Sequence, residues 1–201
     1  HCLSSAASDV YKRQIYFSDG TSGTAEYKGA VRYTHSDNAL GFYANGSEKL
    51  RIDSSGHMGL GVTPNSNWPT NADFKALQIG TGACLFGRGS GDEDRGGIAV
   101  NWYSDGSNNK YIGNGNAARI YLADGNIYFS TAGANSSGAN ASMTLTDRMI
   151  LSSSGRLGLG GFQHDYTMNS SSTDLVIGNG GGGRLSLIHI SEPTRPYLIS
   201  Y

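Results

Sequence analysis

Short runs of alternating apolar and polar residues follow one another along the chain. Alternation with a period of two predicts strands, and no segment shows the sustained 3.6-residue periodicity of a long helix. We therefore predict an all-β fold of short antiparallel strands and hairpins arranged in tandem modules. The predicted strands lie within segments 25–35, 39–53, 57–62, 74–80, 83–89, 97–103, 109–115, 118–125, 126–131, 142–151 and 156–160.

Turn dipeptides divide this series of predicted strands. Asn45-Gly46 stands between the two arms of segment 39–53, and both residues suit the positive φ angles of a tight primed turn, which predicts a hairpin. Asp-Gly pairs at 105–106 and 124–125 mark further turns. Segment 63–73 contains two prolines among polar residues, which is typical of a linker or a long loop.

An internal repeat links two distant parts of the chain. KLRIDSSGHMGLG at 49–61 aligns without a gap to RMILSSSGRLGLG at 148–160, and the substitutions preserve residue type. Each copy predicts a strand, a Ser-Ser-Gly turn, a strand, a loop and a further strand. Repetition at about a hundred residues is typical of a tandem array, so we predict a first β module at 15–73 and a second at 74–185.

Glycines alternate with aliphatic residues inside the repeat. Met58 and Leu60 point to one face of the predicted strand, and Gly59 and Gly61 point to the other. A glycine face weakens a strand unless another backbone approaches it closely. We therefore predict chains packed tightly together in an intertwined fibre, and a glycine-rich strand at a barrel corner is the alternative.

The two ends of the chain share one possible coding sequence on opposite DNA strands. Codons GAT GTG TAT AAG AGA for residues 9–13 have the reverse complement TCT CTT ATA CAC ATC, which encodes residues 186–190. Both ends resemble translated sequencing-adapter sequence. We therefore assign 1–14 and 186–201 to adapters, expect them to have low order, and expect the body between them to be a fragment of a longer protein.

Composition limits the function of this body. Three of the 15 basic and two of the 16 acidic residues lie in the adapter-like ends, which leaves 12 and 14 and a net charge of −2. This balance favours neither nucleic acid nor an anionic membrane as a partner. Cys84 is the only thiol of the body, so neither an internal disulfide nor a zinc-binding cysteine cluster is expected there.

No motif in the sequence identifies a reaction. Asp92, Glu93 and Asp94 could hold a calcium ion, but the calcium-loop spacing is missing, and a solvated turn is the favoured interpretation. The glycine-rich segments 80–91 and 178–185 lack the ending of a phosphate-binding loop. No pattern selects a carboxylate pair for glycoside hydrolysis. We therefore assign no catalytic, cofactor-binding or metal-binding residue, and we expect no enzyme activity.

Other reactive or aromatic residues have structural interpretations. The histidines His35, His57 and His164 are scattered and expected at the surface, and Cys84 is expected to be a small buried hydrophobe. A set of aromatic residues could stack on sugars, although packing in a core or between chains is favoured. These aromatic residues are Trp102, Tyr103, Tyr121, Tyr128 and Phe129.

The string EKLRIDSSGHMGLGVTP at 48–64 resembles a motif of bacteriophage tail-fibre shafts. The matching parts are the strand end at 50–53, the Ser-Ser-Gly turn at 54–56, the Gly-aliphatic-Gly strand at 59–61 and Thr63-Pro64. The second copy matches as far as Gly160 and then departs.

The resemblance implies a structural virion protein of the phage tail, in which three chains share a core and hold a receptor-binding tip. Its implied partners are two further copies of the chain and, through parts outside this fragment, a host polysaccharide or other receptor. A polysaccharide-degrading tailspike and a carbohydrate-binding module or adhesin are the alternatives.

Overall fold

The computed structural model describes residues 12–70, 73–89, 91–162 and 175–177 of the 201-residue chain. The predicted all-β fold is confirmed, and the one helical element within these ranges is the short 3₁₀ helix η1 (Gly23–Tyr27). The strands are β1 (Lys12–Phe17), β2 (Gly29–Thr34), β3 (Ala39–Ala44), β4 (Ser47–Ile52), β5 (Met58–Leu60), β6 (Phe74–Ile79), β7 (Ala83–Arg88), β8 (Gly96–Val100), β9 (Tyr103–Ser104), β10 (Asn109–Lys110), β11 (Gly115–Ala123), β12 (Asn126–Asn135), β13 (Thr146–Leu151), β14 (Leu157–Phe162) and β15 (Leu175–Ile177).

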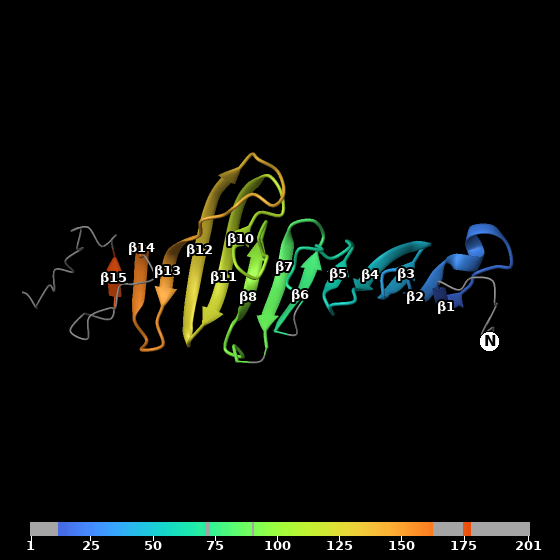
Figure 1. Ribbon diagram of the computed structural model, residues 1–201, viewed down its shortest axis with the longest axis horizontal. Helices are drawn as coiled ribbons and strands as arrows, with labels where there is room; N and C mark the ends of the chain where they lie inside the picture. The colour runs from blue at the N-terminus through green and yellow to red at the C-terminus, as the bar shows by residue number, and fades with distance from the viewer. Residues whose placement is uncertain (1–11, 71–72, 90, 163–174, 178–201) are drawn as a thin grey trace, which may run out of the picture.

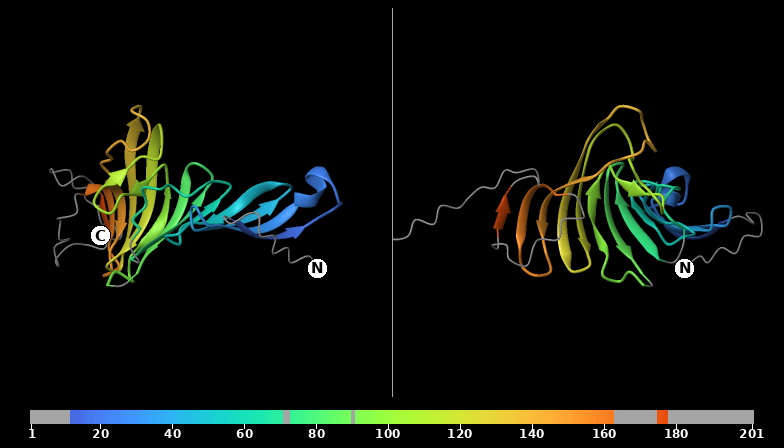
Figure 2. Two further views of the ribbon diagram at one scale, coloured as in Figure 1. Left: turned by 45° about the vertical axis from the view of Figure 1, so that its right-hand side comes forward. Right: turned by 60° about the vertical axis from the view of Figure 1, so that its left-hand side comes forward.

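Thirteen of these strands form one continuous twisted sheet in which each strand pairs with the next one along the chain (Figure 1). Only β9 and β10 leave this order, and they form a separate two-stranded ribbon. Neighbouring strands lie about 4.8 Å apart, so twelve strand spacings extend the sheet to roughly 60 Å. The predicted short antiparallel strands and hairpins thus join side by side into one elongated sheet (Figure 2).

The sequence repeat corresponds to a repeated structural motif. In both copies an antiparallel pair, β4–β5 or β13–β14, is followed by a strand that pairs in parallel, β6 or β15. The turn glycines Gly56 and Gly155 have φ angles of 80° and 81°, which only glycine adopts readily. The predicted order of strand, turn, strand, loop and strand is therefore confirmed in the first copy; in the second copy the strands and the turn are confirmed, and 163–174 lie outside the described residues.

Primed turns close the two hairpins that the dipeptides predict. Asn45 and Gly46 have φ angles of 51° and 73° between β3 and β4, and Asp124 and Gly125 have 53° and 74° between β11 and β12. Two consecutive positive φ angles match the twist of the strands on either side, so they hold each hairpin in register.

One face of the sheet carries the hydrophobic core. Loop residues Trp68, Trp102 and Tyr111 pack over this covered face, where they are 2 %, 2 % and 6 % exposed. The strands beneath contribute aromatic residues beside small ones, so that bulky side chains fit between small neighbours. These strand residues are Phe74, Ala76, Cys84, Phe86, Ala99, Ala117 and Ala132.

The opposite face, called here the open face, is apolar, and no segment that the structure describes covers it. Cross-strand pairing aligns aliphatic side chains into a continuous row across the sheet, and Leu85 and Ile98 within it are 50 % and 51 % exposed. The row runs through Leu40, Ile52, Met58, Leu77, Leu85, Ile98, Ile120, Phe129, Met149 and Leu159. A second row beside it includes Ile15, Val31, Phe42, Leu50, Leu60 and Ile79.

Two expectations about the backbone differ from the structure. Lys12 to Gln14, assigned to the adapter, are paired with β2 as part of β1 rather than having low order, because strand pairing uses backbone groups that every residue offers. A close approach at Gly59 is confirmed, but the approaching backbone belongs to the same chain: a Cβ there would overlap the Val62 carbonyl oxygen and lie 3.1 Å from Pro64 N, both within the loop after β5.

Candidate functional site

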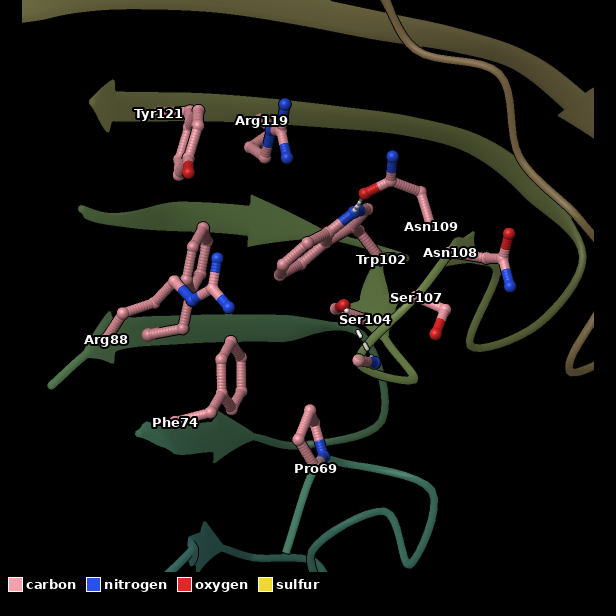
Figure 3. Close-up of a pocket in the computed structure, with 12 residues that line it drawn as sticks. Pro69, Phe74, Arg88, Trp102, Ser104, Ser107, Asn108, Asn109, Arg119 and Tyr121 are labelled. Carbon is pink, nitrogen blue, oxygen red and sulfur yellow. Dashed lines mark hydrogen bonds between the residues drawn. The ribbon is translucent and has the colours of Figure 1, made fainter. Parts of the chain in front are cut away.

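A cavity opens on the covered face between the sheet and the loop that joins β9 to β10 (Figure 3). Its volume is about 240 Å³. Strands β6, β7 and β11 supply aromatic and basic side chains, and the loop supplies small polar ones. The lining residues are Pro69, Phe74, Phe86, Arg88, Trp102, Ser104, Gly106, Ser107, Asn108, Asn109, Arg119 and Tyr121.

A row of near-parallel rings forms one wall of the cavity. Phe86 stacks on Phe74 at 5.9 Å and on Tyr121 at 6.0 Å between ring centroids, with interplanar angles of 15° and 21°. Phe86 and Tyr121 are two strands apart, and Gly97 of β8 lies between them in the register. Their rings meet because glycine leaves the space above its backbone free: a Cβ there would be 3.1 Å from Phe86 Cζ and would overlap the Ile120 carbonyl oxygen.

Arg119 is a cation held by aromatic rings alone. Its guanidinium carbon lies 4.3 Å from the centre of the Tyr121 ring and 5.5 Å from that of Trp102, at cation–π distance. Its Nε is buried and unbonded, and its guanidinium makes no hydrogen bond or ion pair with the part of the chain that the structure describes. Burial lowers the pKa of Arg119, although the charges of Tyr121 and Asp147 oppose this shift.

Hydrogen bonds hold the polar rim in place. Asn109 Oδ1 accepts a bond of 2.8 Å from Trp102 Nε1, which ties the loop to the aromatic wall. Asp105 Oδ1 accepts the backbone N–H groups of Ser107 and Asn108 at 3.0 and 2.7 Å, and these bonds lower the pKa of the Asp105 carboxyl group. The loop is therefore a fixed rim.

The second arginine of the lining is partly neutralised. Arg88 Nη1 forms an ion pair of 3.2 Å with Asp92, which also pairs with Arg95 at 2.9 Å. Because the lining contains two arginines and no Asp or Glu, the cavity has a positive character. The lining likewise offers no carboxylate pair for glycoside hydrolysis.

The acidic residues noted in the sequence are not gathered into an ion site. Asp92 faces the two arginines, and Glu93 accepts a hydrogen bond of 3.1 Å from the backbone N–H of Gly91. Within the described ranges, no three side chains of His, Cys, Asp or Glu lie close enough together to hold a metal ion.

The histidine and cysteine expectations have mixed outcomes. His35 is exposed as predicted, and His164 lies outside the described residues. The surface position predicted for His57 is wrong, because this side chain is 1 % exposed. Its ring lies 2.9 Å from the Pro69 carbonyl oxygen through Nε2 and accepts the Ala76 N–H at 3.2 Å through Nδ1. Two satisfied ring nitrogens allow it to be buried.

Cys84 is the buried hydrophobe that the sequence predicts. It is 3 % exposed, and its Sγ contacts the Trp102 carbonyl oxygen at 3.7 Å. Burial raises the pKa of Cys84 to about 12, so the thiolate form that reacts as a nucleophile is suppressed.

The aromatic candidates serve different purposes. Trp102 and Tyr103 are both 2 % exposed and pack in the core, which confirms the packing interpretation for them. Tyr128 is also buried, Phe129 lies on the open face, and Tyr121 lines the cavity. The predicted group is thus divided between the two faces of the sheet, as alternating positions along a strand require.

Sequence analysis missed Arg119 and Gly97. The signal for Arg119 was a charged residue on a period-two face whose other members are Ala117 and Tyr121. No sequence signal distinguished Gly97 from the other glycines, since its neighbours come from strands distant in the chain.

Comparisons with family models, with curated proteins and with solved structures found nothing that matches this chain. In the described ranges, no helix has the length and apolar character needed to cross a membrane.

Proposed function

We propose that the chain is a segment of a phage tail-fibre shaft, a structural virion protein in which three copies associate through their open faces. The single observation that carries the proposal is the uncovered aliphatic row on one side of an elongated single-layer sheet. The resemblance of segment 48–64 to fibre motifs supports it independently. The role is mechanical: the shaft spaces and orients a receptor-binding tip.

The size of the uncovered apolar area supports burial against further copies. Ten large hydrophobic residues of the open face are 36–62 % exposed, so together they leave roughly 1,000 Å² of apolar surface in water. A monomeric soluble protein rarely exposes a contiguous apolar patch of more than a few hundred Å². These residues are Ile15, Phe17, Phe42, Leu60, Ile79, Leu85, Ile98, Val100, Leu122 and Leu151.

The shape of the open face favours two or more partner copies over a small ligand. The hollow over β7, β8 and β11 has a volume of about 460 Å³ and is lined mainly by aliphatic residues. Aliphatic side chains of another sheet would fill it, because two packed sheets interdigitate their inner faces. Three copies would enclose the rows of all three chains in one dry core.

The oligomeric mass of the full chain, from light scattering after size exclusion, tests this proposal. We expect a mass of three chains for the unsubstituted chain. Ile98→Asp should dissociate this trimer, because a charge buried in the dry core costs several kcal/mol in each copy. Ser136→Asp adds the same charge at an exposed loop position and should leave the trimer intact. A folded, stable monomer of the parent chain would contradict the proposal, and a dimer would contradict the threefold assembly.

A further inference from the structure

We propose that the cavity beside Arg119 binds one acidic sugar unit, a monosaccharide ring that carries a carboxylate. The cavity lies on the covered face, and the ten residues that carry the open-face proposal are not among its lining residues. All of the lining comes from one chain. The inference therefore does not depend on the proposed trimer.

The charge of the ligand follows from the two arginines. Arg88 is already paired with Asp92, whereas the guanidinium of Arg119 has no acceptor among the described residues. A guanidinium presents five N–H donors in a planar fork that matches a carboxylate, so an incoming carboxylate would supply the acceptors that Arg119 lacks. With no acid in the lining to compete, a single negative charge on the ligand would be matched.

The size of the ligand follows from the volume. About 240 Å³ corresponds to roughly eight water molecules of liquid. Bonded atoms occupy less space than separate waters, so one six-membered sugar ring fits, while drug-sized ligands occupy cavities of about 300–1,000 Å³. A nucleotide, with a base, a ribose and a phosphate, is too large for this cavity.

The remaining walls suit the two kinds of surface that a sugar ring has. Tyr121, the partly exposed member of the ring row, offers apolar surface to the C–H groups of the ring, and the buried Phe86 and Phe74 support it from behind. On the other side, the loop residues Ser107 and Asn108 belong to the lining and carry a hydroxyl and an amide that suit ring hydroxyls (Figure 3). An inorganic anion would use Arg119 and leave both of these surfaces unused.

The binding test compares three probes on the full chain: sodium D-glucuronate, D-glucose as its uncharged counterpart, and sodium sulfate as a ringless anion. Binding is measured by Trp fluorescence, since Trp102 lines the cavity, and by saturation-transfer NMR. We expect saturable binding of glucuronate, with glucose and sulfate each at least tenfold weaker. No saturable binding of glucuronate, or equal affinity for glucuronate and sulfate, would overturn the proposal.

Two variants locate the interaction. Arg119→Met retains an unbranched stem beside the rings and removes the charge, so glucuronate should bind at least tenfold more weakly. Arg32→Met is the matched control, because Arg32 also lies over a tyrosine ring, at 4.4 Å from that of Tyr43, with a buried unbonded Nε but outside the cavity. The control should change affinity by less than twofold.

A second variant, Asn109→Asp, tests the same cavity while keeping Arg119, so the proposal can still be tested if Arg119→Met fails to fold. The new carboxylate can still accept the hydrogen bond from Trp102 Nε1, and it adds a negative charge to the rim. We expect at least a tenfold loss of glucuronate affinity with the circular dichroism spectrum unchanged. If Asn109→Asp and Arg119→Met both fold and both retain parental affinity, the site is not in this cavity.

Discussion

The rings of Phe86 and Tyr121 can meet because Gly97 has no side chain between them, and replacing Gly97 with alanine tests this account directly. The added Cβ would overlap the Ile120 carbonyl oxygen and come within 3.1 Å of Phe86 Cζ. The oxygen belongs to the backbone of the paired strand β11 and cannot move without disturbing the ladder. Overpacking of this kind costs about 1–3 kcal/mol, partly offset by the lower entropy of unfolded alanine relative to glycine, about 0.4–1 kcal/mol.

The expected net effect is therefore a loss of about 1–2 kcal/mol in the free energy of unfolding. Gly133→Ala is the matched control, since Gly133 lies in strand β12, is exposed and has nothing within 4 Å of its would-be Cβ. That substitution should be neutral or stabilise the fold by about 0.5 kcal/mol.

Urea unfolding at one fixed protein concentration, followed by the fluorescence of the buried Trp68 and Trp102, measures both variants. If Gly97→Ala is as stable as Gly133→Ala, the account of rings meeting above a glycine is refuted.

Three further predictions concern other parts of the fold. Cys84 should resist alkylation by iodoacetamide at pH 8 in the folded chain and react quickly in urea, because burial raises its pKa to about 12. The label is located by peptide mass spectrometry because Cys2 also carries a thiol, and fast labelling of Cys84 itself in the folded chain would show it to be accessible. His57→Phe should lower the free energy of unfolding by about 2–4 kcal/mol, because the Pro69 carbonyl and the Ala76 N–H lose their hydrogen-bond partners. The control His35→Ala, at an exposed position, should change it by less than about 0.5 kcal/mol in the same denaturation assay. Gly46→Ala should cost about 1–2 kcal/mol because its φ of 73° is left-handed; an unchanged melting temperature would contradict the primed-turn geometry.

Local interactions explain the parts of the fold that the sequence predicted. Asn45-Gly46 and the Ser-Ser-Gly turns are encoded by residues that tolerate positive φ, so the hairpins and both copies of the repeat could be recognised from short segments. Alternation also placed Met58 and Leu60 on one face of β5 and Gly59 on the other, as the structure does. It could not indicate which face the loops would cover, because both faces of strands such as β7 carry apolar residues.

Most features of the candidate site could not be predicted from the sequence. His57 was expected at the surface because a histidine has no fixed place in a pattern, and only the distant Pro69 carbonyl and Ala76 N–H make its burial stable. The glycines of β5 suggested a neighbouring chain, whereas the loop of the same chain returns to cover Gly59. The hydrogen-bond partners of His57 lie 12 and 19 residues away in the sequence, and Gly59 is covered only because the loop after β5 folds back over it.

The sequence by itself determined the class of the fold, the hairpin turns and the repeated motif, because backbone preferences and period-two burial act between near neighbours. Only the tertiary structure decided that thirteen strands join in one sheet, that one face is covered by loops and the opposite face is not covered by any described segment, and that Arg119 lies over aromatic rings with no acidic partner among the described residues. The physical reason is that register brings together residues such as Phe86, Gly97 and Tyr121 from separate strands, and their contacts depend on shapes that meet only after folding.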